Sequence, residues 1–349
     1  MTAATGTAPS RLRAESPLRR LASRPEFGAL MGALLVFLIF SLLGYGGGYL
    51  RWGGIAGYLQ IAAQIGIIGA AVTLLMIAGE FDLSVGSMIG AAGMFLAMLL
   101  AVANLPPWLA VILTFAFALS VGALNGWLVM KTALPSFIVT LATQFILRGG
   151  TIALTRALTG LTIVNVPAEA QQDPALRIFT ANLVTLDNGV ARFNVEILWW
   201  IAVVVIASWV LYRTRFGNWI FAVGGSSQAA RYVGVPVRRV KILLFMTTAG
   251  AAALYACIVT SLVGSANVTT GTGQEFVAIV TAVLGGTLLT GGYGSVVGSA
   301  LGAFVLGATN LGIFYAGINT DWYLVVLGAL LLGAALVNAS VLRRASGAR

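Results

Sequence analysis

The chain has 349 residues, of which 59% are hydrophobic and only 9% are charged, and its mean hydropathy is +0.97. Soluble domains carry about 25% charged residues, so the chain is predicted to be an all-α polytopic membrane protein. It contains no histidine and one cysteine, Cys257. This composition excludes Ser-His-Asp and Cys-His nucleophilic enzymes, the usual zinc sites and a disulfide framework. We expect no metal site, no cofactor bound by this chain and no enzyme activity.

The first 26 residues form a basic tail, predicted to be cytoplasmic, which contains Arg11, Arg13, Arg19, Arg20 and Arg24. An apolar run begins near Phe27. A signal peptide has a similar pattern, but no small-residue cleavage site followed by a soluble domain comes after it. We therefore expect an uncleaved first membrane span.

Residues 27–342 form the predicted membrane domain. A bilayer core needs about 20 apolar residues per helix. On that rule there are about ten spans, at residues 27–45, 56–78, 87–104, 108–130, 136–156, 196–213, 241–263, 275–290, 294–315 and 322–342. The eighth is short, and whether it crosses completely stays open. A short basic tail, residues 343–349, follows the last span.

The basic residues predict the orientation of these spans. With both termini in the cytoplasm, fifteen of the twenty Lys and Arg residues lie inside. This arrangement obeys the positive-inside rule, which explains the net charge of +10 better than nucleic-acid binding does. Four residues then lie outside (Arg51, Arg156, Arg177 and Arg192), and Arg148 lies within the fifth span.

Two stretches interrupt the apolar pattern, near residues 79–87 and 284–299. The first reads GEFDLSVGS and contains Glu80 and Asp82, two of ten acidic residues in the chain. A carboxylate at the centre of a membrane helix costs about 2.5–3.5 kcal/mol on insertion scales. We therefore expect a membrane edge, a re-entrant segment or a watery cavity there, with Ser84 available to cap the next helix. Glycine-interrupted apolar segments in both halves of a chain indicate a transport pathway.

Two long connections join the spans. Residues 160–195 are predicted to face outside, where they could cover a pore mouth or meet a soluble partner. Residues 214–240 are predicted to face the cytoplasm and to contain a short helix at Ser227–Val233, which Gly234 and Pro236 end. This basic inner segment could bind anionic lipid head groups or dock a cytoplasmic ATPase, and charge alone does not separate the two.

Polar side chains within the spans could line a pathway or form its gate. Neutral amides and hydroxyls offer donors and acceptors to a neutral polyhydroxylated solute. Hydrogen bonds between helices, commonly worth about 0.6 kcal/mol each, are the alternative role. The candidates are Glu80, Asp82, Ser84, Gln60, Gln64, Asn125, Phe137, Thr140 and Thr143, with Gln144, Phe81 and Phe276 as further possibilities. For Glu80 and Asp82 a simple turn and helix cap is the alternative.

The energy source must come from outside the chain. No G-x-x-x-x-G-K-[ST] phosphate loop is present, since neither Lys131 nor Lys241 follows a glycine. Glu80, Asp82 and Arg148 are the only ionisable residues expected near membrane depth, which is few for a proton relay. A partner ATPase is the leading expectation. A proton-coupled secondary transporter of a small neutral polar solute is the alternative.

Four motifs give the chain a strong resemblance to the permease subunits of bacterial ATP-binding-cassette (ABC) importers of the ribose, xylose and galactose type. They are GEFDLSVGS at Gly79–Ser87, ALPSFIVTLATQFILRGG at Ala133–Gly150, FGNWIFAVGGSSQAARYVGV at Phe216–Val235 and GTGQEFVAIVTAVLGGTLLTGGYGSVVG at Gly271–Gly298. The similarity covers roughly residues 27–342. It implies a permease in the bacterial inner membrane for a monosaccharide or a related polyol, and it does not identify the solute.

The resemblance also implies partners. These are a second permease copy in a homodimer or heterodimer, a cytoplasmic ABC ATPase and a periplasmic sugar-binding protein. The implied coupling helix, which would seat in a groove of the ATPase, consists of Ser226, Ser227, Gln228, Ala229, Ala230, Arg231, Tyr232, Val233 and Gly234. One departure is Glu80, where the family often has glycine, and this puts the role of the acidic pair in doubt.

Overall fold

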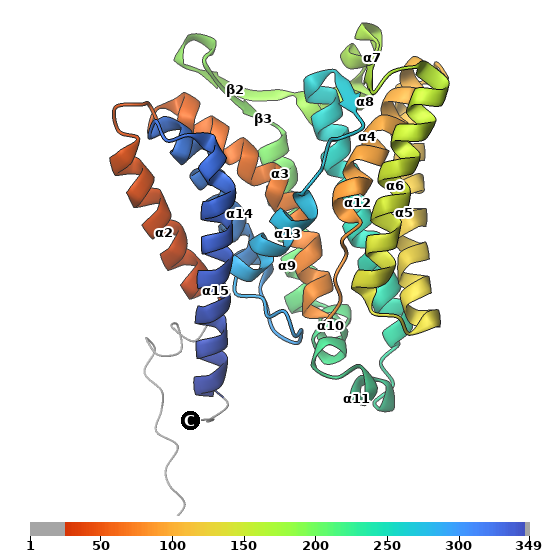
Figure 1. The fold of residues 1–349 in the computed structure, drawn as a ribbon, viewed down its shortest axis with the longest axis vertical. Coiled ribbons are helices and arrows are strands. Elements are labelled where there is room, and N and C mark those ends of the chain that lie inside the picture. The colour runs from red at the N-terminus through yellow and green to blue at the C-terminus, as the bar shows by residue number, and fades with distance from the viewer. Residues whose placement is uncertain (1–24, 346–349) are drawn as a thin grey trace, which may run out of the picture.

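Helix α3 (Trp52–Ile77) is the central element of the structure, a computed structural model that describes residues 25–345 (Figure 1). Most side chains of α3 are buried, and α9, α12, α13 and α14 all pack against it. The predicted basic tail 1–26 lies almost wholly outside the described residues, whereas residues 343–345 of the predicted tail 343–349 continue helix α15.

Eight helices in the described range are long and apolar enough to cross a membrane. With α3 these are α2 (Pro25–Leu43), α5 (Pro107–Thr132), α6 (Ser136–Thr159), α9 (Glu196–Arg213), α12 (Val237–Val263), α14 (Val296–Tyr315) and α15 (Tyr323–Ala345), the last preceded by the 3-10 turn η2 (Thr320–Trp322). Each coincides with a predicted span, because about 20 apolar residues in a row satisfy the bilayer and form all backbone hydrogen bonds within one helix. The prediction of an all-α polytopic membrane protein is confirmed.

The two remaining predicted spans are shorter helices. Helix α4 (Val85–Ala101) follows a non-helical segment at residues 78–84, and α13 (Gln274–Leu284) is followed by a loop at residues 285–295. The eighth predicted span, 275–290, is therefore too long at its C-terminal end, because Gly285 and Gly286 end the helix. Both breaks lie in or beside the stretches predicted to interrupt the apolar pattern.

The helices form two groups on either side of α3 (Figure 1). Helices α2, α14 and α15 lie on one side, where α14 packs on both α2 and α3. Helices α4, α5, α6 and α12 lie on the other side, where α12 packs along α5 and α4. The aromatic side chains of Phe37, Tyr49 and Tyr58 pack in the first group.

One end of the bundle, here called the hairpin end, carries the segment 160–195, which was predicted to face outside. It holds β1 (Ile163–Asn165), α7 (Ala168–Gln172), α8 (Pro174–Thr180), β2 (Asn182–Leu186), the 3-10 turn η1 (Asp187–Gly189) and β3 (Ala191–Asn194). Strand β2 pairs antiparallel with β3, and β1 pairs with β4 (Ser265–Asn267), which follows α12. The sequence analysis did not predict these short strands.

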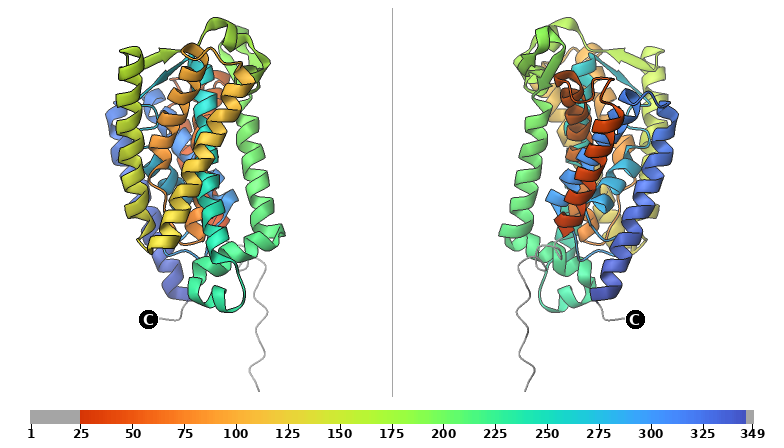
Figure 2. Two further views of the ribbon diagram at one scale, coloured as in Figure 1. Left: turned by 90° about the vertical axis from the view of Figure 1, so that its right-hand side faces the viewer. Right: turned by 90° about the vertical axis from the view of Figure 1, so that its left-hand side faces the viewer.

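The opposite end, here called the α11 end, carries α10 (Arg215–Gly225) and α11 (Ser227–Tyr232) (Figure 2). Helix α11 lies within the predicted short helix. Helix α10 was not predicted. It has only 11 residues, several of them polar or glycine, so a search for long apolar runs does not detect it.

Candidate functional site

The segment between α3 and α4, residues 78–84, is held by side chains of α6. The backbone N–H of Phe81 donates to Ser136 Oγ over 3.1 Å, and that of Leu83 donates to Thr140 Oγ1 over 3.0 Å. A backbone group without a partner at membrane depth costs several kcal/mol, so non-helical backbone survives there only where protein groups bind it. Thr140, a predicted pathway residue, thus supports the break.

Asp82 lies at the centre of this break, and its side chain is 1% exposed. Oδ1 accepts hydrogen bonds from the backbone N–H of Ser84 (2.9 Å) and from Ser84 Oγ (2.6 Å). Oδ2 accepts a third from Thr248 Oγ1 of α12 (2.5 Å). Three donors on one buried carboxyl group are the compensation that a buried acid needs.

The hydrogen bonds continue outward to α5 and α6. Asn125 Nδ2 of α5 donates to Ser84 Oγ over 3.0 Å, and Thr143 Oγ1 of α6 donates to Asn125 Oδ1 over 2.7 Å. The donors therefore form a chain that runs from Thr143 through Asn125 and Ser84 to the Asp82 carboxyl group. We call Asp82, Ser84, Asn125, Thr143 and Thr248 the Asp82 network. It ties the break to three helices at once.

The Asp82 network gathers four of the predicted pathway residues and adds Thr248, which the sequence analysis missed. Ser84 does precede α4, as expected of a cap, but its side chain accepts no bond from a helix N–H and donates to Asp82 instead. The polar atoms of this group bind one another. These contacts are the interhelical hydrogen bonds that the sequence analysis gave as the alternative to a solute-binding role.

Glu80 forms an ion pair with Lys241 in the first turns of α12, and both side chains are 12% exposed. This contact gives the acidic residue that departs from the family pattern a structural partner. Lys241 and Thr248 lie two helical turns apart, so both project from one face of α12. That face therefore holds the break at both Glu80 and Asp82.

The helices α4 and α13 approach each other near their N-termini through Glu275. Its side chain is 2% exposed, and Oε1 accepts a hydrogen bond from Gln144 Nε2 of α6 over 2.7 Å. Oε2 has no hydrogen-bond partner and lies so close to Gly86 that a Cβ there would be 1.9 Å from it. Only glycine fits at position 86. The carboxylate is well placed because helix N-termini favour negative charge.

The remaining predicted pathway residues lie elsewhere. Gln60 Nε2 donates to the backbone oxygen of Arg192 (2.7 Å), and Gln64 Nε2 donates to Glu196 Oε2 (3.0 Å). Both glutamines lie toward the hairpin end, and 13 residues of helix, about 20 Å, separate Gln64 from the end of α3. Phe137 is 51% exposed on α6.

Two further buried acids were not singled out by the sequence analysis, which named Glu80, Asp82 and Arg148 as the ionisable residues near membrane depth. Glu196 and Glu275 are 1% and 2% exposed in the first turns of α9 and α13. The available signal was their rarity, because the chain has only ten acidic residues. Among the described residues, no group of three or more His, Cys, Asp or Glu side chains could hold a metal ion.

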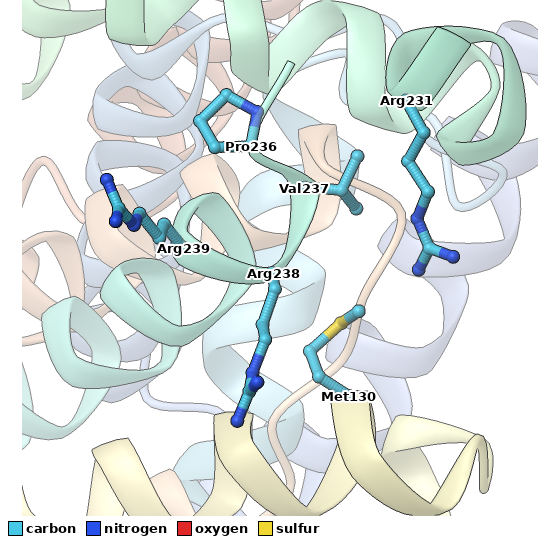
Figure 3. Close-up of a pocket in the computed structure, with 6 residues that line it drawn as sticks. All are labelled: Met130, Arg231, Pro236, Val237, Arg238 and Arg239. Atoms are coloured by element: carbon cyan, nitrogen blue, oxygen red, sulfur yellow. The ribbon is translucent and has the colours of Figure 1, made fainter. Parts of the chain in front are cut away.

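Helix α11 projects from the bundle with an exposed surface. Tyr232 and Val233 are 82% and 79% exposed, and the Ser226 hydroxyl caps the helix by accepting from the Ala229 N–H over 3.2 Å. A pocket of about 430 Å³ lies beside it, lined by Met130, Arg231, Pro236, Val237, Arg238 and Arg239 (Figure 3). Tyr232 and Val233 thus place an aromatic and an aliphatic side chain side by side on the exposed end of α11.

The end of α10, just before α11, contacts both breaks. A Cβ at Gly224 would lie 1.8 Å from the Ile77 backbone oxygen and 2.6 Å from the Gly292 nitrogen. The Gly292 N–H in turn donates to the Ile77 oxygen over 2.8 Å. We call Ile77, Gly224 and Gly292 the glycine junction. It joins the end of α10 to the end of α3 and to the loop that follows α13.

The structure is a bundle of apolar helices with two broken segments, and the short helix α11 is exposed at one end of the bundle. This arrangement is typical of a polytopic membrane transport protein. The chain belongs to the permease family described as "Branched-chain amino acid transport system / permease component", which matches residues 54–335. The resemblance to sugar-importer permeases is confirmed by curated relatives.

Three of these relatives cover most of the chain. The fructose import permease protein FruG of Bifidobacterium longum is 29% identical over 86% of this chain and 88% of its own length. The ribose import permease protein RbsC of Escherichia coli is 30% identical over 80% and 84%. The probable ABC transporter permease protein YphD of Escherichia coli is 33% identical over 93% and 92%.

Proposed function

We propose that this chain is the membrane-spanning subunit of an ATP-driven importer that moves a monosaccharide or a related polyol across the bacterial inner membrane. A separate cytoplasmic ATPase supplies the energy, and a periplasmic binding protein delivers the solute. The proposal rests above all on α11, an exposed helix whose base packs through Gly224 on both breaks of the membrane helices.

Helix α11 is the proposed contact with the ATPase. Its exposed Tyr232 and Val233 would fill an apolar recess of that partner, while Arg231 would meet a polar or acidic rim. Motion of the ATPase would then pass through the glycine junction to residues 78–84 and 285–295. A second permease copy would complete the pathway.

A sugar rather than an amino acid is the proposed solute, although the family description names branched-chain amino acids. Two of the relatives, FruG and RbsC, are named as import permeases for fructose and ribose. At the first break, the Asp82 carboxyl group accepts three hydrogen bonds from Ser84 and Thr248, and Glu80 pairs with Lys241, so both of these acids already have partners within the protein.

Reconstitution tests the proposal. Proteoliposomes that contain the permease, its cognate ATPase and the sugar-loaded binding protein are expected to hydrolyse ATP faster than those with empty binding protein, and to accumulate sugar. Permease alone is expected to be inert. If permease alone accumulated sugar in response to a pH gradient, the chain would be a proton-coupled secondary transporter instead.

A further inference from the structure

An apolar groove of about 640 Å³ runs between α9 and α12. Its floor is α3, at Ala71 and Leu74, and its walls include Val210 of α9 and Leu243 and Thr247 of α12. Both wall helices pack on α3, but they scarcely touch each other (Figure 2). The groove is thus open to the outside of the bundle between α9 and α12, with α3 beneath it.

The α11 end of this groove is basic. Helix α10 contacts both α9 and α12 there, and its Phe216 lines the groove. Arg213 ends α9 one turn after Val210, Arg215 begins α10, and Arg239 lies one turn before Leu243 on α12. All three are exposed, and the one ion pair among the described residues, Lys241–Glu80, involves none of them.

Of these arginines, Arg213 and Arg215 lie outside the pocket beside α11, whereas Arg239 also lines that pocket. Figure 3 shows Arg231 and Arg238 reaching toward Met130, whereas Arg239 extends away from Met130 on the other side of α12. The inner segment therefore presents basic residues in two directions. Its Arg231 lies with the exposed side chains of α11, and its Arg239 lies in line with the groove.

We propose that the groove binds one acyl chain of an anionic phospholipid, whose phosphate group meets Arg213, Arg215 and Arg239. Basic clusters at the cytoplasmic ends of membrane helices attract anionic lipid head groups, and basic pockets between such helices bind them. The apolar walls suit a hydrocarbon chain. A membrane helix of a second copy, about 10 Å wide and 30 Å long, is far larger than the groove.

Lipid retention by the full-length protein tests the charge requirement. The purified protein is incubated in detergent with equal amounts of phosphatidylglycerol and phosphatidylcholine, and retained lipid is counted by native mass spectrometry. Wild type is expected to retain phosphatidylglycerol several-fold over phosphatidylcholine. The double variant Arg215→Gln/Arg239→Gln is expected to lose that preference, whereas the matched control Arg238→Gln keeps it. No preference in wild type, or an equal loss in the control, would overturn the proposal.

A second pair of variants tests the groove itself. A Cβ at Gly250 would lie 3.4 Å from Leu119 Cδ2, an ordinary contact, so the rest of a leucine side chain would enter the groove. Gly250→Leu is expected to reduce retention of both lipids. The control Gly149→Leu, on α6 with open space at its Cβ, is expected to change neither. If Gly250→Leu instead broke a dimer and left lipid retention intact, the groove would belong to a contact between copies.

Photo-crosslinking gives a readout that needs no variant. Phosphatidylglycerol with a diazirine on its acyl chain is incorporated into vesicles with the wild-type protein and activated by light. Peptides around Val203–Val210 and Leu243–Leu254 are expected to be labelled several-fold above the exposed face of α15. Uniform labelling of all lipid-facing helices would contradict a specific site.

Discussion

Thr248 of α12 donates a hydrogen bond to Oδ2 of Asp82 over 2.5 Å, although 166 positions separate the two residues in the chain. Both side chains are buried, and Asp82 lies in the only non-helical stretch between α3 and α4. The contact therefore fixes the break against a helix that begins immediately after the proposed coupling region. It is one of the polar contacts that join the two halves of the chain, with Glu80–Lys241 and Gln144–Glu275.

Replacing Thr248 by Val is expected to destabilise the protein by about 1–3 kcal/mol, because a buried carboxylate loses one of its donors. The measurement is thermal unfolding of the purified protein in detergent. Thr247→Val is the matched control, since the exposed Thr247 hydroxyl donates only to the Leu243 oxygen of its own helix. Equal melting temperatures for the two variants would show that the contact contributes nothing.

The ion pair between Glu80 and Lys241 makes a second prediction. Glu80→Lys and Lys241→Glu each place like charges together at a site with 12% exposure, whereas the double exchange restores the pair. We expect a coupling of about 1–2 kcal/mol, between the values for exposed and buried pairs. Binding-protein-stimulated ATPase activity should fall in each single variant and recover in the double variant. Independent, additive losses would exclude a direct role of the pair.

The sequence predicted the spans and the breaks well for a simple physical reason. A membrane helix must contain about 20 apolar residues, and this requirement is visible in one dimension. Helix α11 was also predicted from a local signal, because Gly234 and Pro236 end the short helix expected at Ser227–Val233. Glycine-containing interruptions predicted near residues 79–87 and 284–299 likewise overlap the breaks at residues 78–84 and 285–295.

Side-chain partners could not be predicted in the same way. The spacing of Gln60 and Gln64 places them on one face of α3, but it does not show which neighbour that face meets. The two side chains donate hydrogen bonds to residues 192 and 196 rather than to Asp82. Thr248 is one of several hydroxyl residues in α12, and nothing local distinguishes it from Thr247. Strands β1 and β4 are three residues each, too short for alternation to show.

The protein is expected to tolerate Glu275→Gln but to be destabilised by Glu275→Ala. Glu275→Gln keeps the acceptor for Gln144 and offers an NH2 group near the Gly271 oxygen, which lies 2.6 Å from the Cβ position at Gly86. Glu275→Ala leaves the buried Gln144 without a partner, at a cost of about 1–3 kcal/mol. Melting temperatures in detergent should rank wild type and Gln together, with Ala lower. A Gln variant as unstable as Ala would mean that the negative charge itself is required.

Charge reversal at Arg231 should separate ATPase docking from folding. Arg231→Glu is exposed on α11, so membrane insertion and melting temperature are expected to stay within about 0.5 kcal/mol of wild type. Co-purification of the cognate ATPase is expected to fall several-fold. Arg192→Glu at the hairpin end is the control and should co-purify normally. Unchanged ATPase stoichiometry in Arg231→Glu would count against docking at α11.

The glycine junction gives the sharpest comparison, because Gly224 and Gly225 are adjacent. A Cβ at Gly224 would lie 1.8 Å from the Ile77 backbone oxygen, whereas a Cβ at Gly225 meets nothing within 4 Å. Gly224→Ala must therefore separate α10 from the end of α3 and from residue 292. Gly225→Ala is expected to be neutral or slightly stabilising, by up to about 1 kcal/mol, since alanine favours helix.

The same two variants are expected to differ in sugar transport. If the junction transmits motion from α11 to the breaks, Gly224→Ala should still bind the ATPase through its exposed α11 but lose several-fold in sugar uptake per ATP hydrolysed. Gly225→Ala should transport like wild type. The decisive measurement is the ratio of uptake to hydrolysis in proteoliposomes, together with ATPase co-purification. A Gly224→Ala variant with a normal ratio would show that the close contact serves packing alone.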